Sequence, residues 1–235
     1  MKRISLAPAA IALALFACAA LAEEEKPAAE GPELKGGAEQ WSYAIGVQIG
    51  SDFKRTGMAL DAEALKAGIL DALAGKPRLS QKDLAAAMMK LRMEGQRKMS
   101  EAAGNNEKAG KEFLAGNAIK EGVTTTKSGL QYEVMKEGEG ANPVATDTVK
   151  VHYRGTLIDG TEFDSSYSRG QPATFPLNGV IPGWTEGVQL MKPGAKYRFF
   201  VPSGLAYGAR GAGKVIGPNA TLIFEVELLA IEEKK

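Results

Sequence analysis

The spacing of apolar residues changes near residue 122, and this change constrains the fold more than any other feature of the sequence. Before it, apolar residues recur every three or four positions, as at Trp41, Ile45, Ile49 and Phe53, which is the spacing of one helix face. After it, apolar and polar residues alternate, which is typical of half-buried strands. Residues 122–235 also contain 11 of the 16 aromatic residues and seven of the 11 prolines. The sequence therefore predicts a helical first part and a β-rich second part.

Three helices are expected in the first part. The second of them has Asp61 as its N-cap and ends near Gly75. The third begins after Ser80, which forms a capping-box-like pair with Asp83, and extends from 81 to about 116, or about 50 Å. A break near Gly104 is the alternative, because glycine weakens a helix.

These helices carry more apolar surface than they can bury within one chain. Four of the eight methionines fall in the third helix, and methionine adapts well to helix–helix contacts; they are Met88, Met89, Met93 and Met99. They could pack within the chain, but a helical dimerisation module is the favoured interpretation.

The second part predicts a small antiparallel sheet that wraps around one short helix. Period-two alternation occurs at 130–134, 149–153, 197–201 and 222–228, with glycine-containing turns between these segments. A short helix is expected at 183–190, and His152 is expected on the opposite strand face from Tyr153. The fold class is therefore α+β, with an all-α part and a long connecting helix before the sheet.

The first 22 residues have the features of a secretory signal peptide. Lys2 and Arg3 precede an apolar stretch at 11–20, and Ala20-Leu21-Ala22 is an A-x-A cleavage site. We therefore expect export, with the periplasm as the destination. The alternative is a lipid on Cys18, which would make the chain an outer-membrane lipoprotein or a cell-surface protein. Residues 23–37 are acidic and rich in Pro, Gly and Ala, and a disordered linker is expected there.

Composition excludes several classes of function. The chain has 29 basic and 28 acidic residues, which argues against nucleic-acid binding. One Cys and one His exclude a Cys/His zinc site and a disulfide within the chain. The stretch 208–214 approaches a phosphate-binding loop, but Val215 stands where Ser or Thr is needed, so a glycine-rich loop between strands is expected. Beyond the leader, no apolar run is long enough to span a membrane.

Five motifs in the second part resemble the FKBP-type peptidyl-prolyl isomerases, in that family's order. They are Val151-His152-Tyr153-Arg154-Gly155, Asp159-Gly160-Thr161-Glu162-Phe163-Asp164-Ser165-Ser166, Val180-Ile181-Pro182-Gly183-Trp184, Leu205-Ala206-Tyr207-Gly208 and Pro218-Asn219-Ala220-Thr221-Leu222-Ile223-Phe224. The first part, from Trp41-Ser42-Tyr43-Ala44-Ile45-Gly46 onward, is similar to the macrophage infectivity potentiator group of exported bacterial FKBPs, which are homodimers.

The resemblance implies the domain organisation and the site. Residues 1–22 are the signal peptide, 23–37 the linker, 38–121 a helical dimerisation domain and 122–235 the isomerase domain. Trp184 is implied as the floor under a substrate proline, while the Ile181 N–H and the Tyr207 hydroxyl bond substrate carbonyls. Arg169 is implied to pair with Asp164. The implied catalytic residues are Tyr153, Phe163, Asp164, Ile181, Trp184, Tyr207 and Phe224, and the implied substrate-binding residues are Val180, Arg169, Val215 and Ile216.

The resemblance also implies ligands and partners. The expected substrates are unfolded or proline-containing polypeptides, the expected assembly is a homodimer, and macrolide inhibitors are expected as further pocket ligands. No metal or cofactor is implied. Ala173 departs from the family, which often has an aromatic residue there. The alternative functions are a holdase chaperone with little isomerase activity and, supported only by the leader, an adhesin or structural protein.

Overall fold

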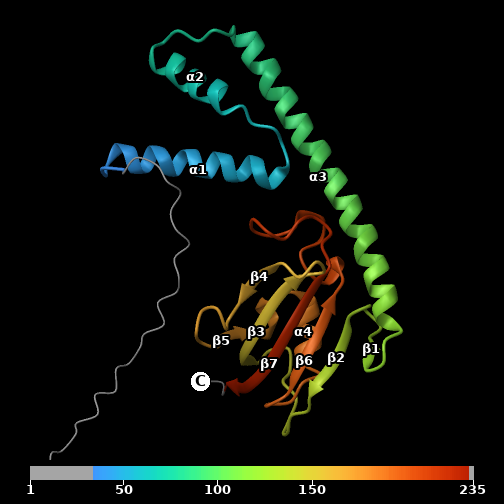
Figure 1. The fold of residues 1–235 in the computed structure, drawn as a ribbon. Coiled ribbons are helices and arrows are strands. Elements are labelled where there is room, and N and C mark those ends of the chain that lie inside the picture. Colours follow the sequence, from blue (N-terminus) through green and yellow to red (C-terminus); the bar gives the residue numbers. More distant parts are fainter. Residues whose placement is uncertain (1–33, 233–235) are drawn as a thin grey trace, which may run out of the picture. The chain divides into compact units, whose positions relative to one another are not determined.

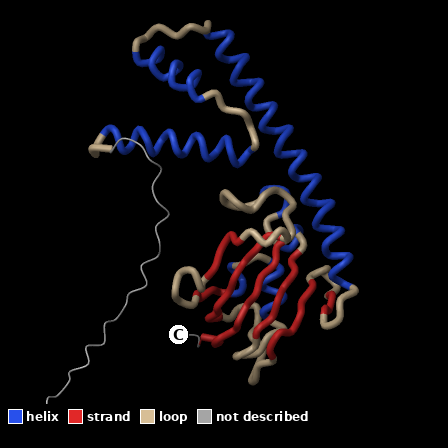
Figure 2. Tube along the Cα trace, viewed as in Figure 1, coloured by secondary structure: helices blue, strands red, loops and turns tan. Residues whose placement is uncertain are grey.

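The computed structural model describes residues 34–232. The expected signal peptide, Cys18 and most of the expected linker lie outside the described residues. Within them, the long helices precede residue 119 and the strands follow it, apart from one short α-helix and three single 3₁₀ turns in the second part (Figure 2). The change in apolar spacing near residue 122 therefore marks a real change of secondary structure.

The helical part consists of α1 (Ala38–Thr56), α2 (Ala62–Leu73) and α3 (Gln81–Ala118). The expected caps are confirmed: the Asp61 carboxylate accepts a hydrogen bond from the Ala64 N–H at 2.9 Å, and the Ser80 hydroxyl accepts one from the Asp83 N–H at 3.2 Å. The helix α3 is continuous through Gly104, so the alternative of a break does not hold. Every helix in residues 34–232 is too short or too polar to cross a bilayer.

The second part is a seven-stranded antiparallel sheet (Figure 1). Its order is β1-β2-β6-β7-β3-β4, and β5 pairs with β3. The two long strands β3 and β7 pair along most of their length, and β3 is offset by a register shift after Gly155 where it meets β4. The strands are β1 (Val123–Thr125), β2 (Gln131–Lys136), β3 (Thr148–Leu157), β4 (Glu162–Ser165), β5 (Ala173–Pro176), β6 (Lys196–Val201) and β7 (Leu222–Glu232).

One face of the sheet wraps around the short helix α4 (Pro182–Val188), and the core lies between them. The helix approaches the sheet closely because two glycines face it. A Cβ at Gly187 would lie 2.7 Å from the Phe199 ring, and one at Gly183 would lie 2.5 Å from Val201. Both glycines are buried, so a larger residue at either position would push the helix off the sheet.

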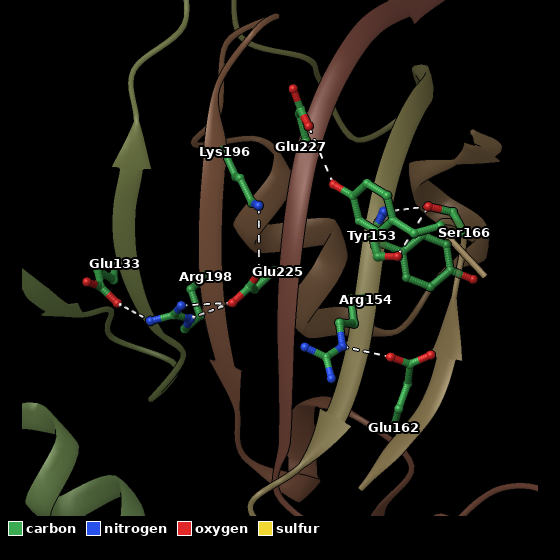
Figure 3. A network of polar contacts seen from close by, with 10 residues as sticks. Glu133, Tyr153, Arg154, Glu162, Ser166, Lys196, Arg198, Glu225 and Glu227 are labelled. Carbon is green, nitrogen blue, oxygen red and sulfur yellow. Dashed lines mark hydrogen bonds and ion pairs between the residues drawn. The ribbon is translucent and has the colours of Figure 1, made fainter. Parts of the chain in front are cut away.

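The other face of the sheet is polar, as the alternation predicts (Figure 3). Arg198 on β6 donates to Glu133 on β2 at 3.0 Å and to Glu225 on β7 at 2.8 Å. Arg154 on β3 donates to Glu162 on β4 at 2.7 Å. Opposite charges therefore face each other across neighbouring strands, which supports the strand register at a modest gain of about 0.2–1 kcal/mol per pair.

Candidate active site

A cavity of about 640 Å³ opens between the sheet, α4 and the loop before β7. Its lining is mostly aromatic and aliphatic, with Asp164 as its carboxylate. The lining residues are Tyr153, Phe163, Asp164, Phe175, Gly179, Val180, Ile181, Trp184, Tyr207, Ala212, Gly213, Lys214, Val215, Ile216 and Phe224.

The aromatic rings of the cavity are arranged edge to face around Trp184. The centroid of its ring lies 5.2 Å from Tyr153, 5.8 Å from Phe175 and 5.3 Å from Phe224, with interplanar angles between 82° and 89°. Phe163 packs on Phe224 in the same manner at 5.4 Å. Such edge-to-face contacts hold each ring in one orientation. The neighbouring rings leave Trp184 only 4% exposed, so it forms a rigid part of the cavity wall.

The indole N–H of Trp184 is buried without a hydrogen-bond partner among the described residues. An unpaired buried donor costs about 1–3 kcal/mol, and such groups are uncommon in stable cores. This cost is consistent with a residue that is kept for a binding role as well as for packing.

A polar cluster at one edge of the cavity joins Tyr153, Asp164 and Arg169. The Tyr153 hydroxyl donates to the Asp164 carboxylate at 2.5 Å. Arg169 pairs with the same carboxylate and also donates to the Tyr153 oxygen at 2.8 Å. Its guanidinium lies 5.4 Å from the centre of the Tyr153 ring. The three groups therefore fix one another in position.

These contacts set the charge of both acidic groups. Burial raises the pKa of Tyr153, and the hydrogen bond to Asp164 raises it further. Burial opposes ionisation of Asp164, but hydrogen bonds from Tyr153 and Arg169 outweigh it and lower the pKa of that carboxyl. Asp164 is thus a carboxylate and Tyr153 a neutral phenol at neutral pH.

The backbone of Tyr153 is fixed by Ser166, which directly follows β4. The buried Ser166 hydroxyl accepts a hydrogen bond from the Tyr153 N–H at 2.8 Å (Figure 3). The same hydroxyl lies 3.0 Å from the Nδ1 of His152. His152 stacks on Tyr167 at 4.7 Å and is not part of the cavity lining, as expected from its strand face.

Two hydrogen-bond donors at the cavity have no partner within residues 34–232. The Ile181 carbonyl accepts from the Trp184 and Thr185 N–H groups at 2.9 and 3.1 Å as α4 begins, but the Ile181 N–H donates to none of these residues. The Tyr207 hydroxyl is likewise unbonded there, and its side chain is 41% exposed. Both donors are therefore free to bond a ligand.

Ten of the eleven expected site residues line the cavity, and the eleventh, Arg169, reaches it through Asp164 and Tyr153. Sequence reasoning missed Phe175, although its alternation with Ala173 on β5 could have revealed it. It also missed Ser166 and the lining residues Gly179, Ala212, Gly213 and Lys214. No periodic pattern identifies these residues, because they lie in turns or loops or act through the backbone of another strand.

The fold and the cavity define a class of protein in which an antiparallel sheet wraps around one short helix and encloses an aromatic cavity large enough for an apolar ring, with free hydrogen-bond donors beside it. Comparisons with known proteins agree. The sequence profile described as "FKBP-type peptidyl-prolyl cis-trans isomerase" matches residues 139–229, and "Domain amino terminal to FKBP-type peptidyl-prolyl isomerase" matches 38–134. The FKBP-type peptidyl-prolyl cis-trans isomerase FkpA of Aeromonas hydrophila is 48% identical, over 98% of this chain and 94% of its own length.

Two further comparisons cover most of the chain. The outer membrane protein MIP of Legionella longbeachae is 40% identical, over 88% of this chain and 91% of its own. The crystal structure of FkpA from Escherichia coli matches 85% of this chain and 99% of its own, with a TM-score of 0.66 and 42% identity. The chain therefore belongs to the FKBP-type peptidyl-prolyl cis-trans isomerases and has their enzymatic activity on polypeptides.

Proposed function

We propose that the aromatic cavity binds the proline ring of an Xaa-Pro segment against Trp184 and catalyses rotation about the preceding peptide bond. The uncatalysed barrier is about 18–20 kcal/mol. In the transition state the amide is twisted and its carbonyl is less polar than in the planar form. A dry apolar wall stabilises this state more than the planar one, so rotation needs no covalent intermediate. The ring of aromatic contacts around Trp184 is the observation that carries this proposal.

The polar groups of the cavity fix the peptide on both sides of the rotating bond. The free Ile181 N–H and the Tyr207 hydroxyl donate to substrate carbonyls, while Asp164, fixed by Tyr153 and Arg169, faces the twisted amide. Phe163 and Phe224 enclose the proline ring. The residues that contact the flanking parts of the peptide are Val180, Val215 and Ile216.

Fluorescence can test where the proline binds, because the chain has only two tryptophans. In a Trp41→Phe variant, emission comes from Trp184 alone, and we expect a saturable change when an Ala-Leu-Pro-Phe peptide is added. The matched control is the same peptide with alanine in place of proline. The proposal fails if isomerisation proceeds normally while the emission stays constant.

We also propose that residues 38–121 form a dimerisation domain and that 122–235 carry the isomerase site. The supporting observation is that α1 and α2 have no buried residue. Monomers rarely expose such large apolar patches. The large apolar residues of this part that are at least half exposed are Trp41, Tyr43, Ile45, Val47, Ile69, Leu70, Leu73, Leu79, Met88, Met89, Met93 and Ile119. A second copy of the chain would cover them.

Light scattering tests the dimer directly. The chain without its leader should give about twice the monomer mass at micromolar concentration, and Leu73→Glu together with Met88→Glu should shift it toward the monomer. A wild-type protein that is monomeric throughout this range would contradict the proposal.

Export to the periplasm is proposed from the leader sequence, with Cys18 lipidation as the alternative. The relative from Legionella longbeachae is named outer membrane protein MIP, which supports a location outside the cytoplasm. Mass spectrometry of the protein recovered from cells decides between the two: a chain that begins at Glu23 supports cleavage after Ala22, and a lipid on Cys18 supports the anchor.

Macrolide binding to the aromatic cavity is proposed on family resemblance alone.

A further inference from the structure

One wall of the cavity is a long loop between β6 and β7, which we call the rim loop (residues 208–219). Its middle supplies the lining residues from Ala212 to Ile216. The loop is closed on itself: Asn219 N–H donates to the Gly208 carbonyl at 2.9 Å, and Ala212 and Ile216 exchange backbone hydrogen bonds of 2.9 and 3.1 Å. Its residues therefore hold one another in place, and the position of the loop sets the width of the cavity at Val215 and Ile216.

The rim loop packs against the core at Ile216 but is hollow behind Val215. A second cavity of about 190 Å³ lies there and shares Val215 with the first. Its other lining includes Asn106 of α3, Gly217, and Leu157 and Asp159 near the end of β3. With a cavity on each side, Val215 is not positioned by close packing, so the position of the loop depends on Ile216, on the Lys214 hydrogen bond to Gln48 at 3.3 Å and on the contacts at its base.

The contacts at the base come from α3. The Asn106 amide donates to the Pro218 carbonyl at 2.8 Å, and the Asn219 amide donates to the Ala103 carbonyl at 3.4 Å. Asn219 also has a positive φ of 55°, a conformation that few residues adopt, and this φ sets the direction in which the chain leaves the rim loop.

One turn further along, α3 meets Thr221 at close range. A Cβ on the buried Gly110 would collide with the Thr221 hydroxyl, and Thr221 is only 5% exposed. The helix α3 therefore contacts the end of the rim loop at one turn and Thr221, two residues after the loop, at the next.

We propose that Asn106 is a positioning residue for the isomerase site: through Pro218 it holds the rim loop, and thereby Val215 and Ile216, at the working width of the cavity. The inference rests on the assignment of the aromatic cavity as the substrate site. This inference gives α3 a part in substrate selection. A bulky side chain on the residue before proline reaches Val215 and Ile216 of the rim loop, whereas the side chain of alanine does not.

The test compares Asn106→Ala with Asn105→Ala in the full chain. Asn105 is the neighbouring residue on α3, is exposed, and its side chain makes no hydrogen bond within residues 34–232, so its variant controls for the loss of an asparagine from the helix. For Asn106→Ala we expect kcat/KM to fall about two- to tenfold on a peptide with leucine before proline, the size of one lost hydrogen bond, and less on one with alanine. Asn105→Ala should match wild type on both.

A second readout separates positioning from general stability. Amide NMR signals of residues 211–217 should shift and gain mobility in Asn106→Ala, while signals from the β1–β2 region stay in place. If Asn106→Ala does not fold, Asn219→Gly removes the second contact and keeps the positive φ. Unchanged kinetics and an unchanged rim in a folded variant would overturn the inference. If Asp164→Ala also kept full activity, the site assignment itself would have failed.

Discussion

At the scale of single residues, the cavity combines groups whose positions are fixed with groups that are free. Tyr153, Asp164 and Arg169 satisfy one another, so each is held before substrate arrives. The Tyr207 hydroxyl and the Ile181 N–H have no partner among the described residues and can bond substrate at no cost to the fold. Substitutions in these two sets should therefore differ in their effects on stability.

Tyr207→Phe removes a hydroxyl that bonds nothing in the described part of the chain. We expect kcat/KM for an Xaa-Pro peptide to fall about two- to tenfold and the melting temperature to stay within about 1 °C. Asp164→Ala should lower both kcat/KM and the melting temperature, because Arg169 and Tyr153 lose their shared partner. We expect kcat/KM to fall by up to about a hundredfold. Tyr43→Phe, at a residue that does not line the cavity, is the matched control for the loss of a phenol hydroxyl and should leave kcat/KM unchanged. Full activity in both cavity variants would reject the assigned roles.

The pKa shifts at the cavity predict a broad pH plateau. Asp164 has a pKa below the unfolded value of about 3.9, so its stabilising contribution is complete above that pH and is lost as the pH falls through the lower folded value. Tyr153 has a raised pKa and stays neutral up to at least about pH 10. We expect kcat/KM to vary less than about twofold from pH 5.5 to 8.5, measured by NMR exchange without a coupling protease. A step near neutral pH would show that another group controls the reaction.

At the scale of elements, sequence periodicity predicted more of the fold than of its packing. Helix starts at Asp61 and Ser80, the alternating strands and the short helix near 183–190 all follow from local chemistry, and the structure confirms them. Family motifs located most of the cavity. Contacts between distant segments have no local pattern: neither the Ser166 bond to Tyr153 nor the Asn106 bond to Pro218 could be read from spacing.

The expected domain boundary at residue 122 also follows local pattern and not long-range contacts. It marks the change in secondary structure, but the last turns of α3, before this boundary, pack on the sheet. Phe113 contacts Phe200 with ring centroids 5.9 Å apart. Asn117, 1% exposed, donates to the buried Gln131 side chain at 2.9 Å, and Gln131 donates to the Leu114 carbonyl at 2.9 Å. The sheet therefore depends on residues that precede the boundary.

Two fragments test this dependence. A fragment of residues 123–235 leaves Gln131 without its helix partners and exposes Phe200, whereas 96–235 keeps both contacts. We expect the shorter fragment to be less stable by about 2 kcal/mol or more in urea unfolding, because it loses the packing of Phe113 on Phe200 and two hydrogen bonds of Gln131 that are worth about 0.5–1.5 kcal/mol each. Within the longer fragment, Asn117→Ala should reproduce part of the loss. Equal free energies of unfolding would show that the end of α3 is dispensable.

At the scale of the whole molecule, the chain joins a cavity formed by its second part to a helical part with exposed apolar surface. Every residue that lines the cavity lies between 153 and 224. A short peptide therefore needs only the second part of the chain and the end of α3 that contacts the rim loop. A long unfolded client can contact the helices as well, and in a dimer it can reach two cavities.

Because only a long client can contact the helices, we expect removal of the helices to slow isomerisation of long substrates but not of short peptides. The fragment 96–235 keeps the cavity and the Asn106 contact, so it should isomerise a tetrapeptide at the rate of the full protein. On a protein whose refolding is limited by proline isomerisation, the full protein should be at least several-fold faster at equal site concentration. The reason is avidity, because contacts with the helices raise the effective concentration of the client's prolines near the cavity. A full-length variant made monomeric by Leu73→Glu and Met88→Glu should give a refolding rate between that of the fragment and that of the full protein. Equal rates for fragment and full protein on both substrates would mean that the helices take no part in capturing clients, and their exposed surface would then serve assembly alone.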